Sequence, residues 1–402
     1  MAETKTPLEA NGDTIVEIKA LVDALPDAGS GGGDTNPTAV SKAVNFIDFD
    51  GTIRYSYTLD EVAALTALPP LPTHDGLVCQ GWNWTLADIK ALGRDVTVGA
   101  MYITDDGKTR IYIHLEEGRT SPLLGCCPNG TVTVDWGDGT TPDTLTGTST
   151  GIVKWTPTHN YAAPGDYVIK LTVDGSMAFY GTTGSNQGSG ILRYTSASDA
   201  RNQVYQNATQ KVEIGNGVTS IRDNVFYRCN SLSSITIPNG VTSIGSSVFV
   251  RCFPLSSITI PNGVTSIGGS PFYGCNSLSS ITIPNGVTSI GSNAFYDCNS
   301  LSSITIPSSV TSIRDNAFYD CYSLSSITIP SSVTSIKPYA FYSCSGIKFY
   351  DFSAATSVPT LGNANAFTGI AADCEIRVPA SLVDSWKAAT NWATYADHIV
   401  GV

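Results

Sequence analysis

The sequence predicts a mainly β protein of several domains, and three observations lead to this prediction. One side-chain pattern recurs every 23 residues through the C-terminal half of the chain. Short apolar–polar alternations separated by Gly, Pro, Asn or Asp fill residues 36–175, which is typical of strands and turns. The chain of 402 residues is long enough for two or three domains, each with its own core.

Composition excludes two classes of partner. The formal net charge is −12 and the pI is about 4.7, whereas a nucleic-acid-binding protein needs a basic surface to neutralise phosphates. No run of about 18 apolar residues occurs, so no membrane insertion is expected. The N-terminus also lacks the basic and apolar regions of a secretory signal.

Residues 1–35 are expected to form an N-terminal helix and a Gly-rich linker. Thr14 to Leu25 places Ile15, Ile18 and Val22 on one helical face, and GSGGGD follows. Such a helix on a tether could join copies of the chain into a homo-oligomer. An ordinary docked or frayed terminus explains the same pattern equally well.

Residues 36–120 are expected to form a β-rich module of unknown family. VNFIDFDGTIRYSYT predicts a hairpin that turns at Asp50-Gly51, and MYITDDGKTRIYIHL predicts a second that turns at Asp106-Gly107. Between them, Thr85 and Asp88 fit the capping box of a helix that runs through Leu92.

Residues 121–180 are expected to form a second β-domain. Its motifs are WGDGT, from Trp136 to Thr140, and HNYAAPGDYVIKLTV, which begins at His159. These segments resemble the polycystic-kidney-disease-type immunoglobulin-like domain. The resemblance implies a non-catalytic β-sandwich that acts as a spacer or a binding module.

Residues 181–350 carry the repeat. In L-S-S-I-T-I the isoleucines alternate with hydroxyl residues, which is the period of a strand with one buried face. Pro then ends the strand, and Asn-Gly or Ser-Ser makes a turn. One unit cannot bury its apolar face alone, whereas stacked units can, so the pattern predicts a solenoid.

The unit L-x-x-I-x-I-P-x-x-V-T-x-I-G-x-x-A-F-x-x-C resembles the BspA-like leucine-rich repeats of bacterial surface proteins, over about residues 209–350. The resemblance implies a surface protein that binds host or matrix proteins, or other cells. Residues 351–402 are expected to form a C-terminal cap. There Ser381 would cap a short helix that carries Trp386, while Trp392 and Tyr395 would cover the last coil.

Two sets of solenoid residues are candidate binding residues. By strand alternation, one hydroxyl column faces outward from the sheet. A Tyr follows the inward Phe in most repeats and predicts a partly exposed tyrosine row. The candidates are Ser234, Thr236, Ser257, Thr259, Ser280, Thr282, Ser303, Thr305, Ser326 and Thr328 in the hydroxyl column, and Tyr273, Tyr296 and Tyr319 in the row. Solvated filler that favours strand formation explains the hydroxyl column as well.

FIDFDGTI resembles the nucleophile motif of haloacid-dehalogenase-type phosphatases, with Asp48 as nucleophile and Asp50 as acid/base. That chemistry needs a doubly wound parallel sheet, and residues 36–120 show no alternating strand–helix pattern that would supply one. We therefore interpret the motif as a hairpin turn. An enzyme whose catalytic unit is residues 36–120 stays as an alternative.

No metal or cofactor site is expected. One Cys per repeat forms a line rather than the tetrahedron that zinc requires, so the cysteines are expected to be free, buried thiols. Asp135, Asp138 and Asp143 could hold calcium, although acidic turns are common. Trp82 and Trp84 would share a strand face, where we expect them to build a core.

The sequence thus predicts a non-catalytic recognition or adhesion protein at a cell surface or outside the cell. Its partner would be a protein or glycan on a host or bacterial surface, bound through the solenoid. A second hypothesis is a prophage or phage tail-associated protein that recognises a bacterial surface. Gene neighbours would separate the two.

Overall fold

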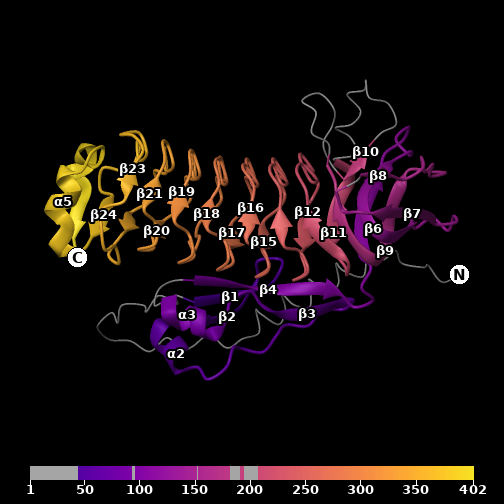
Figure 1. Cartoon of the computed structure of the whole chain (residues 1–402), viewed down its shortest axis with the longest axis horizontal. Helices are drawn as coiled ribbons and strands as arrows, with labels where there is room; N and C mark the ends of the chain where they lie inside the picture. The colour runs from indigo at the N-terminus through magenta and orange to yellow at the C-terminus, as the bar shows by residue number, and fades with distance from the viewer. Residues whose placement is uncertain (1–43, 93–95, 152, 182–190, 194–206) are drawn as a thin grey trace, which may run out of the picture. The chain divides into compact units, whose positions relative to one another are not determined.

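The computed structural model describes residues 44–92, 96–151, 153–181, 191–193 and 207–402. The helix predicted from Thr14 to Leu25 and the linker that follows it lie outside these ranges. Figure 1 shows the successive strands of the C-terminal half stacked in sequence order, with the helical segments of the C-terminus at one end.

The C-terminal half is a solenoid whose coils add strands to two rows of parallel strands, here called ladders; hydrogen bonding divides the ladders into shorter sheets, and residues 301–306 add no strand. In the regular repeats each residue pairs with its equivalent 23 positions on, as in Ser243↔Ser266 and Ile258↔Ile281, and the spacing widens in the last coils, as in Ser335↔Thr360. The first ladder follows the L-S-S-I-T-I segments and holds β11 (Thr209–Glu213), β13 (Ser234–Thr236), β15 (Ser257–Thr259), β17 (Ser280–Thr282), β20 (Ser326–Thr328), β22 (Phe349–Asp351), β24 (Glu375–Val378) and β25 (Ile399–Gly401). The second follows V-T-S-I and holds β12 (Val218–Ile221), β14 (Ser243–Ile244), β16 (Ser266–Ile267), β18 (Ser289–Ile290), β19 (Ser312–Ile313), β21 (Ser335–Ile336) and β23 (Thr360–Leu361).

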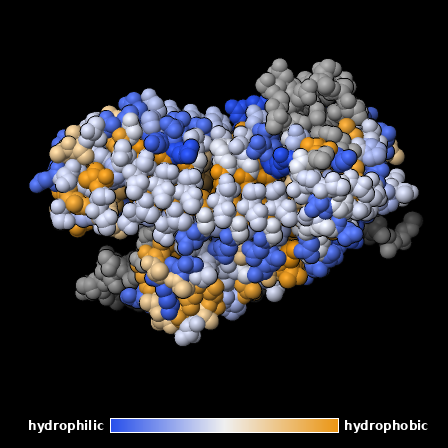
Figure 2. Space-filling view, in the orientation of Figure 1, coloured by the Kyte–Doolittle hydropathy of each residue, from blue (hydrophilic) through white to orange (hydrophobic). Residues whose placement is uncertain are grey.

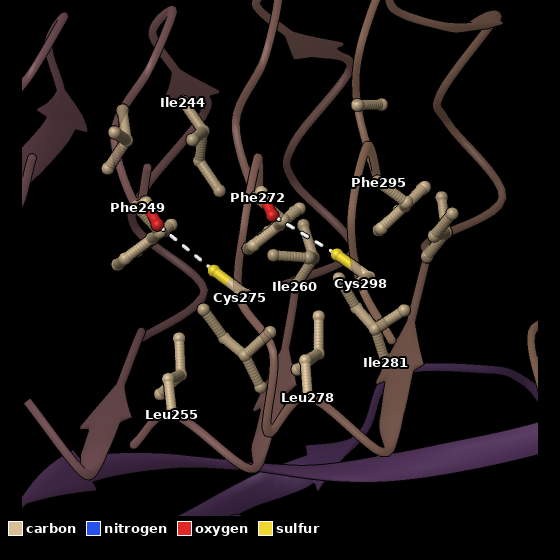
Figure 3. Close-up of a cluster of buried hydrophobic side chains, with 14 of the residues drawn as sticks. Ile244, Phe249, Leu255, Ile260, Phe272, Cys275, Leu278, Ile281, Phe295 and Cys298 are labelled. Carbon is tan, nitrogen blue, oxygen red and sulfur yellow. Dashed lines mark hydrogen bonds between the residues drawn. The ribbon is translucent and has the colours of Figure 1, made fainter. Parts of the chain in front are cut away.

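The solenoid core consists of columns of identical side chains. The column from Phe226 to Phe341, continued by Phe367, stacks with ring centroids 5.2–5.6 Å apart. Leucine and isoleucine columns lie beside it (Figure 3). Each ring is buried, so every coil covers the apolar surface that its neighbour would otherwise expose.

The cysteine column is buried and free, as predicted. From Cys252 to Cys344, each thiol of the column also donates a hydrogen bond to a Phe carbonyl of the preceding coil. Figure 3 shows Cys275 Sγ 3.0 Å from the Phe249 oxygen and Cys298 Sγ 3.1 Å from that of Phe272. The thiol therefore satisfies a buried carbonyl as well as filling space.

The strands before the solenoid form its first layer. They are β5 (Thr109–Leu115), β6 (Leu123–Asp135), β7 (Asp143–Thr148), β8 (Lys154–Trp155), β9 (Gly165–Phe179) and β10 (Leu192–Arg193). β5 pairs with β11, and the end of β9 pairs with β12, so both ladders start on this sheet. An immunoglobulin-like sandwich is not confirmed, because β6, β7 and β9 belong to one sheet that continues into the coils.

Residues 44–104 form a separate four-stranded sheet in the order β2-β1-β4-β3. Its elements are β1 (Val44–Ile47), β2 (Ile53–Tyr57), α2 (Leu59–Ala64), β3 (Leu77–Trp82), α3 (Leu86–Leu92) and β4 (Val96–Thr104). The β1–β2 hairpin is confirmed, and Thr85 accepts from the Asp88 N–H at the start of α3 as predicted. Trp82 and Trp84 are buried, also as predicted.

The second predicted hairpin is wrong. Gly107 turns the chain with φ +69°, but β4 then pairs with β1 and β3 whereas β5 pairs with β9 and β11. Alternation showed that both segments are strands. The alternation did not indicate which strands they would pair with.

The cap consists of η1 (Ala380–Leu382), α5 (Val383–Ala388) and η2 (Trp392–His398). Trp386, Trp392 and Tyr395 are buried over the last coil, with the two indole rings 4.5 Å apart. Ser381 lies inside η1 and caps neither helix, because the residue before α5 is Leu382 and makes no side-chain cap. That detail of the prediction is wrong.

Candidate functional site

The tyrosine row predicted from the repeat exists. Tyr273, Tyr296, Tyr319 and Tyr342 stack with centroids 4.5–4.7 Å apart and nearly parallel planes. Each follows an inward Phe and is half-buried. We call these four residues the tyrosine ridge. Because the ring faces cover one another, the ridge presents ring edges and hydroxyl groups.

The residue after each ridge position has a left-handed backbone. φ is +69° at Gly274, +59° at Asp297, +60° at Asp320 and +58° at Ser343. The N–H of each donates to the coil that follows, for example Asp297 to the Tyr319 carbonyl at 2.8 Å. This third set of inter-coil bonds fixes the ridge against the two ladders, so the ridge is rigid.

Two tyrosines of the ridge have raised pKa values. Burial first, and then neighbouring tyrosines and carboxylates, raise the pKa of Tyr296 and of Tyr319. Tyr322 lies beside them, is 46% exposed and has its pKa raised to about 12, chiefly by its hydrogen bond to Asp320. All three hydroxyls are therefore protonated donors at neutral pH.

The hydroxyl column has a different environment from the one expected. Thr236, Ser257, Thr259, Thr282 and Thr305 are buried, Ser234, Ser280, Ser326 and Thr328 are half-buried, and Ser303 is exposed. β4 packs on β13, β15 and β17 and covers them. The expectation of an open, solvated face is wrong for these coils. The sheet that covers it starts more than 100 residues earlier in the chain, so no spacing in the repeat could have revealed it.

The contact between β4 and the hydroxyl column is close. Gly99 lies so near that a Cβ there would be 2.3 Å from Thr259 Oγ1 and 2.8 Å from Thr282 Oγ1. Ser257 Oγ donates to the Phe49 carbonyl at 2.8 Å. In the described part of the chain, the hydroxyls of Thr236, Thr259 and Thr282 nevertheless have no hydrogen-bond partner.

Asp48 lies in a saturated polar cluster. Its Oδ1 accepts from the Tyr102 hydroxyl at 2.6 Å and from the Phe49 N–H at 2.9 Å. Its Oδ2 lies 2.7 Å from Arg54 and 2.8 Å from His74. Burial opposes ionisation of Asp48, but these hydrogen bonds outweigh it and lower its pKa.

This arrangement supports the hairpin interpretation of the FIDFDGTI motif. Asp48 is completely buried and every acceptor direction faces a protein donor, so the carboxylate is not free to attack a substrate. Asp50 instead accepts from the Thr52 N–H within the turn. Sequence reasoning missed Arg54, His74 and Tyr102 as partners of Asp48, and no spacing signal connected them.

The acidic turn of residues 135–143 is also occupied internally. Asp138 accepts from Thr140 and His159, the latter at 2.9 Å, and Asp143 accepts from the Trp136 indole at 2.9 Å. His159 stacks on Trp136 at 4.6 Å. Among the residues with described positions, no group of three or more metal-ligating side chains converges, and no helix is long and apolar enough to cross a membrane.

Comparisons with known proteins agree with this geometry in the repeats. Residues 198–298 and 265–382 match the family model for the BspA type leucine rich repeat region, in 6 copies. Together the two stretches cover less than half of the chain. No curated protein gives a significant match.

Several solved structures are similar to parts of the chain. A leucine-rich repeat protein of T. pallidum is 29% identical over 32% of this chain and 64% of its own, with a TM-score of 0.29. One from Bacteroides ovatus is 26% identical over 41% of this chain and 48% of its own, with a TM-score of 0.35. The chain thus spans between about half and two thirds of these relatives. The family match over residues 198–382 and the coil geometry of residues 207–382 support a leucine-rich repeat region of the BspA type in this part of the chain.

Proposed function

We propose that this chain is a non-catalytic recognition protein that binds a protein or glycan through its solenoid. The observation that carries the proposal is the tyrosine ridge: stacked, half-buried rings on a rigid backbone. Aromatic side chains are the commonest anchors of binding surfaces. Their hydroxyls add donors, and little conformational entropy is lost because the rings are already ordered.

The ridge serves this role better than the hydroxyl column. That column has no aromatic or Arg anchor, and β4 covers most of it. Ser303, Ser326 and Thr328 lie at its accessible end and would supply secondary contacts. Figure 2 shows the solenoid surface turned to the viewer mostly in pale tones of intermediate hydropathy, as rows of Ser, Thr and Gly produce.

The proposal places the protein at a cell surface or outside the cell. The match to BspA-type repeats supports this, because proteins with repeats of that type are typically surface-associated. Residues 121–180, with their immunoglobulin-like motif, would act as the base on which the first coil forms. The saturated cluster at Asp48 gives no support to a catalytic N-terminal module.

The test is a binding screen of the full chain against glycan and protein arrays. We expect Tyr296→Ser/Tyr319→Ser to weaken binding at least about tenfold, the effect of losing anchor residues. Thr265→Ala is the control, because Thr265 is exposed on the outer side of the other ladder. If the double variant keeps its melting temperature and binds as tightly as the wild type, the ridge is not the site.

A further inference from the structure

The left-handed column that follows the ridge extends into the two coils before it, and it carries charge in a particular order. Read along successive coils, this charge row is Arg228, Arg251, Gly274, Asp297, Asp320 and Ser343. Two cations therefore precede a glycine, and two anions follow it. Within residues 209–351 every other column that bears charge carries a single sign, as Arg222, Arg314 and Lys337 do, so the change of sign is peculiar to this row.

The structure leaves these charges without ion pairs. Arg251 is exposed, and Arg228, Asp297 and Asp320 are half-buried. None of the four forms a salt bridge with any residue whose position is described. Arg228 lies 5.4 Å from the Tyr227 ring and its Nε has no hydrogen-bond partner within the described ranges.

Two copies of the charge row match opposite charges only when the second copy runs in the opposite direction. A two-fold axis lying in an interface and crossing the row at Gly274 would place Arg251 opposite Asp297 of a second copy, and Arg228 opposite Asp320 of that copy. Both pairs occur twice by symmetry. A parallel arrangement would oppose like charges. A shift by one coil would leave two charges unpaired.

The other columns fit the same axis. Gly274 has no side chain to hold two backbones apart where the axis crosses. About this axis Tyr273 would meet its own symmetry mate, whereas Tyr319 and Tyr296 of the ridge would face Tyr227 and the apolar Val250 of the second copy. Coil spacing is the same in both copies, roughly 4.8 Å between strands, so the register holds over all five coils.

We propose that the partner of the tyrosine ridge is a second copy of this chain, docked antiparallel about an axis at Gly274. This inference rests on the proposed function and names its partner. Binding of an unrelated protein or glycan does not explain a charge order that changes sign at one coil. Docking of a second copy explains it, because each charge then meets its opposite.

The experiment is sedimentation velocity on full-length chains with two charge variants. The acidic variant is Arg228→Asp/Arg251→Asp, and the basic variant is Asp297→Arg/Asp320→Arg. Both residue types already occur at this left-handed position, so the repeats themselves show that each substitution fits. Thr265→Ala is again the control.

We expect the wild type to dimerise, and each charge variant alone to associate at least about tenfold more weakly because like charges meet. An equimolar mixture of the two variants should restore association, since every opposed pair is then acidic against basic. Wild-type dimerisation should also weaken between about 0.05 M and about 0.5 M salt.

Three outcomes overturn the inference: a monomeric wild type, variants that dimerise as well as the wild type, or a mixture that stays monomeric. Dimers that persist in both variants would place association elsewhere, such as the N-terminal segment. If the chain is monomeric but still binds an array partner through Tyr296 and Tyr319, this inference is wrong and the proposed function stands. If the Tyr296→Ser/Tyr319→Ser variant binds its array partner as tightly as the wild type, the proposed function is wrong.

Discussion

Replacing Thr282 by Val should stabilise the protein. The Thr282 side chain is 1% exposed beneath β4, and its hydroxyl has no hydrogen-bond partner in the described part of the chain. Folding therefore removes water from this hydroxyl without replacing its bonds, which costs about 1–3 kcal/mol. Val has nearly the same shape and no such group. We expect Thr282→Val to raise the free energy of unfolding by about 1 kcal/mol or more.

Urea denaturation at fixed temperature measures this change, with the m-value as a check that the unfolded state is unaltered. Thr265→Val is the control for an exposed position and should stay within about 0.5 kcal/mol of the wild type. Thr328→Val tests the same position of a later coil, where the side chain is half-buried, and should gain less. If Thr282→Val is neutral or destabilising while the controls behave as stated, the reasoning about unpaired hydroxyls under β4 is refuted.

The remaining predictions concern the cores and their titration. Phe272→Ala should cost about 3–5 kcal/mol, because it empties a position between two stacked rings; thermal unfolding measures this, and a change below about 1 kcal/mol would contradict the stacked column. Burial raises the pKa of Cys275 to about 12 from 9.0, so the folded state holds a proton that the unfolded state releases. Stability should thus be complete below pH 9 and fall as pH rises from there toward 12; an alkaline denaturation series checks it, and an increase would contradict it. The pKa of Asp48 is lowered from 3.8, so its contribution should be present above about pH 4 and be lost in more acidic solution. Asp48→Asn should cost about 1.5–3 kcal/mol, the range for hydrogen bonds to a charged group, because Arg54 and Tyr102 then meet a neutral amide; hydrogen exchange in β1 and β2 would report it, and unchanged protection would argue against the cluster.

The solenoid could be predicted from the sequence because its information is local and repeated. Phe, Cys and Ile each recur at one period, so a single interpretation explains them all at once. The same logic predicted the buried thiols and the tyrosine ridge. It did not show that the thiols from Cys252 to Cys344 donate to carbonyls of the preceding coil, because those bonds depend on the rise between coils.

The N-terminal half was less predictable because its contacts join distant segments. β1 pairs in parallel with β4, more than 50 residues on, and alternation alone cannot select such a partner. Asp106-Gly107 did make a turn, but it separates two sheets instead of closing a hairpin. Asp48 gathered Arg54, His74 and Tyr102 from three different elements, so only the folded chain shows that the motif is structural.

The positions that vary between coils identify where this solenoid can carry specificity. Packing fixes the residue types of the inward columns, because each ring or thiol packs against the same residue type in the next coil. From Ser234 to Thr328 the outward positions of the first ladder are all Ser or Thr, and β4 covers part of them. The left-handed turn after the ridge has neither constraint: its side chain points away from the core, and Arg, Gly, Asp and Ser all occur there with positive φ. Selection for binding can act at this position without disturbing the stack. A charge order that changes sign at one coil is therefore best explained by what the ridge meets, because nothing inside the fold requires it.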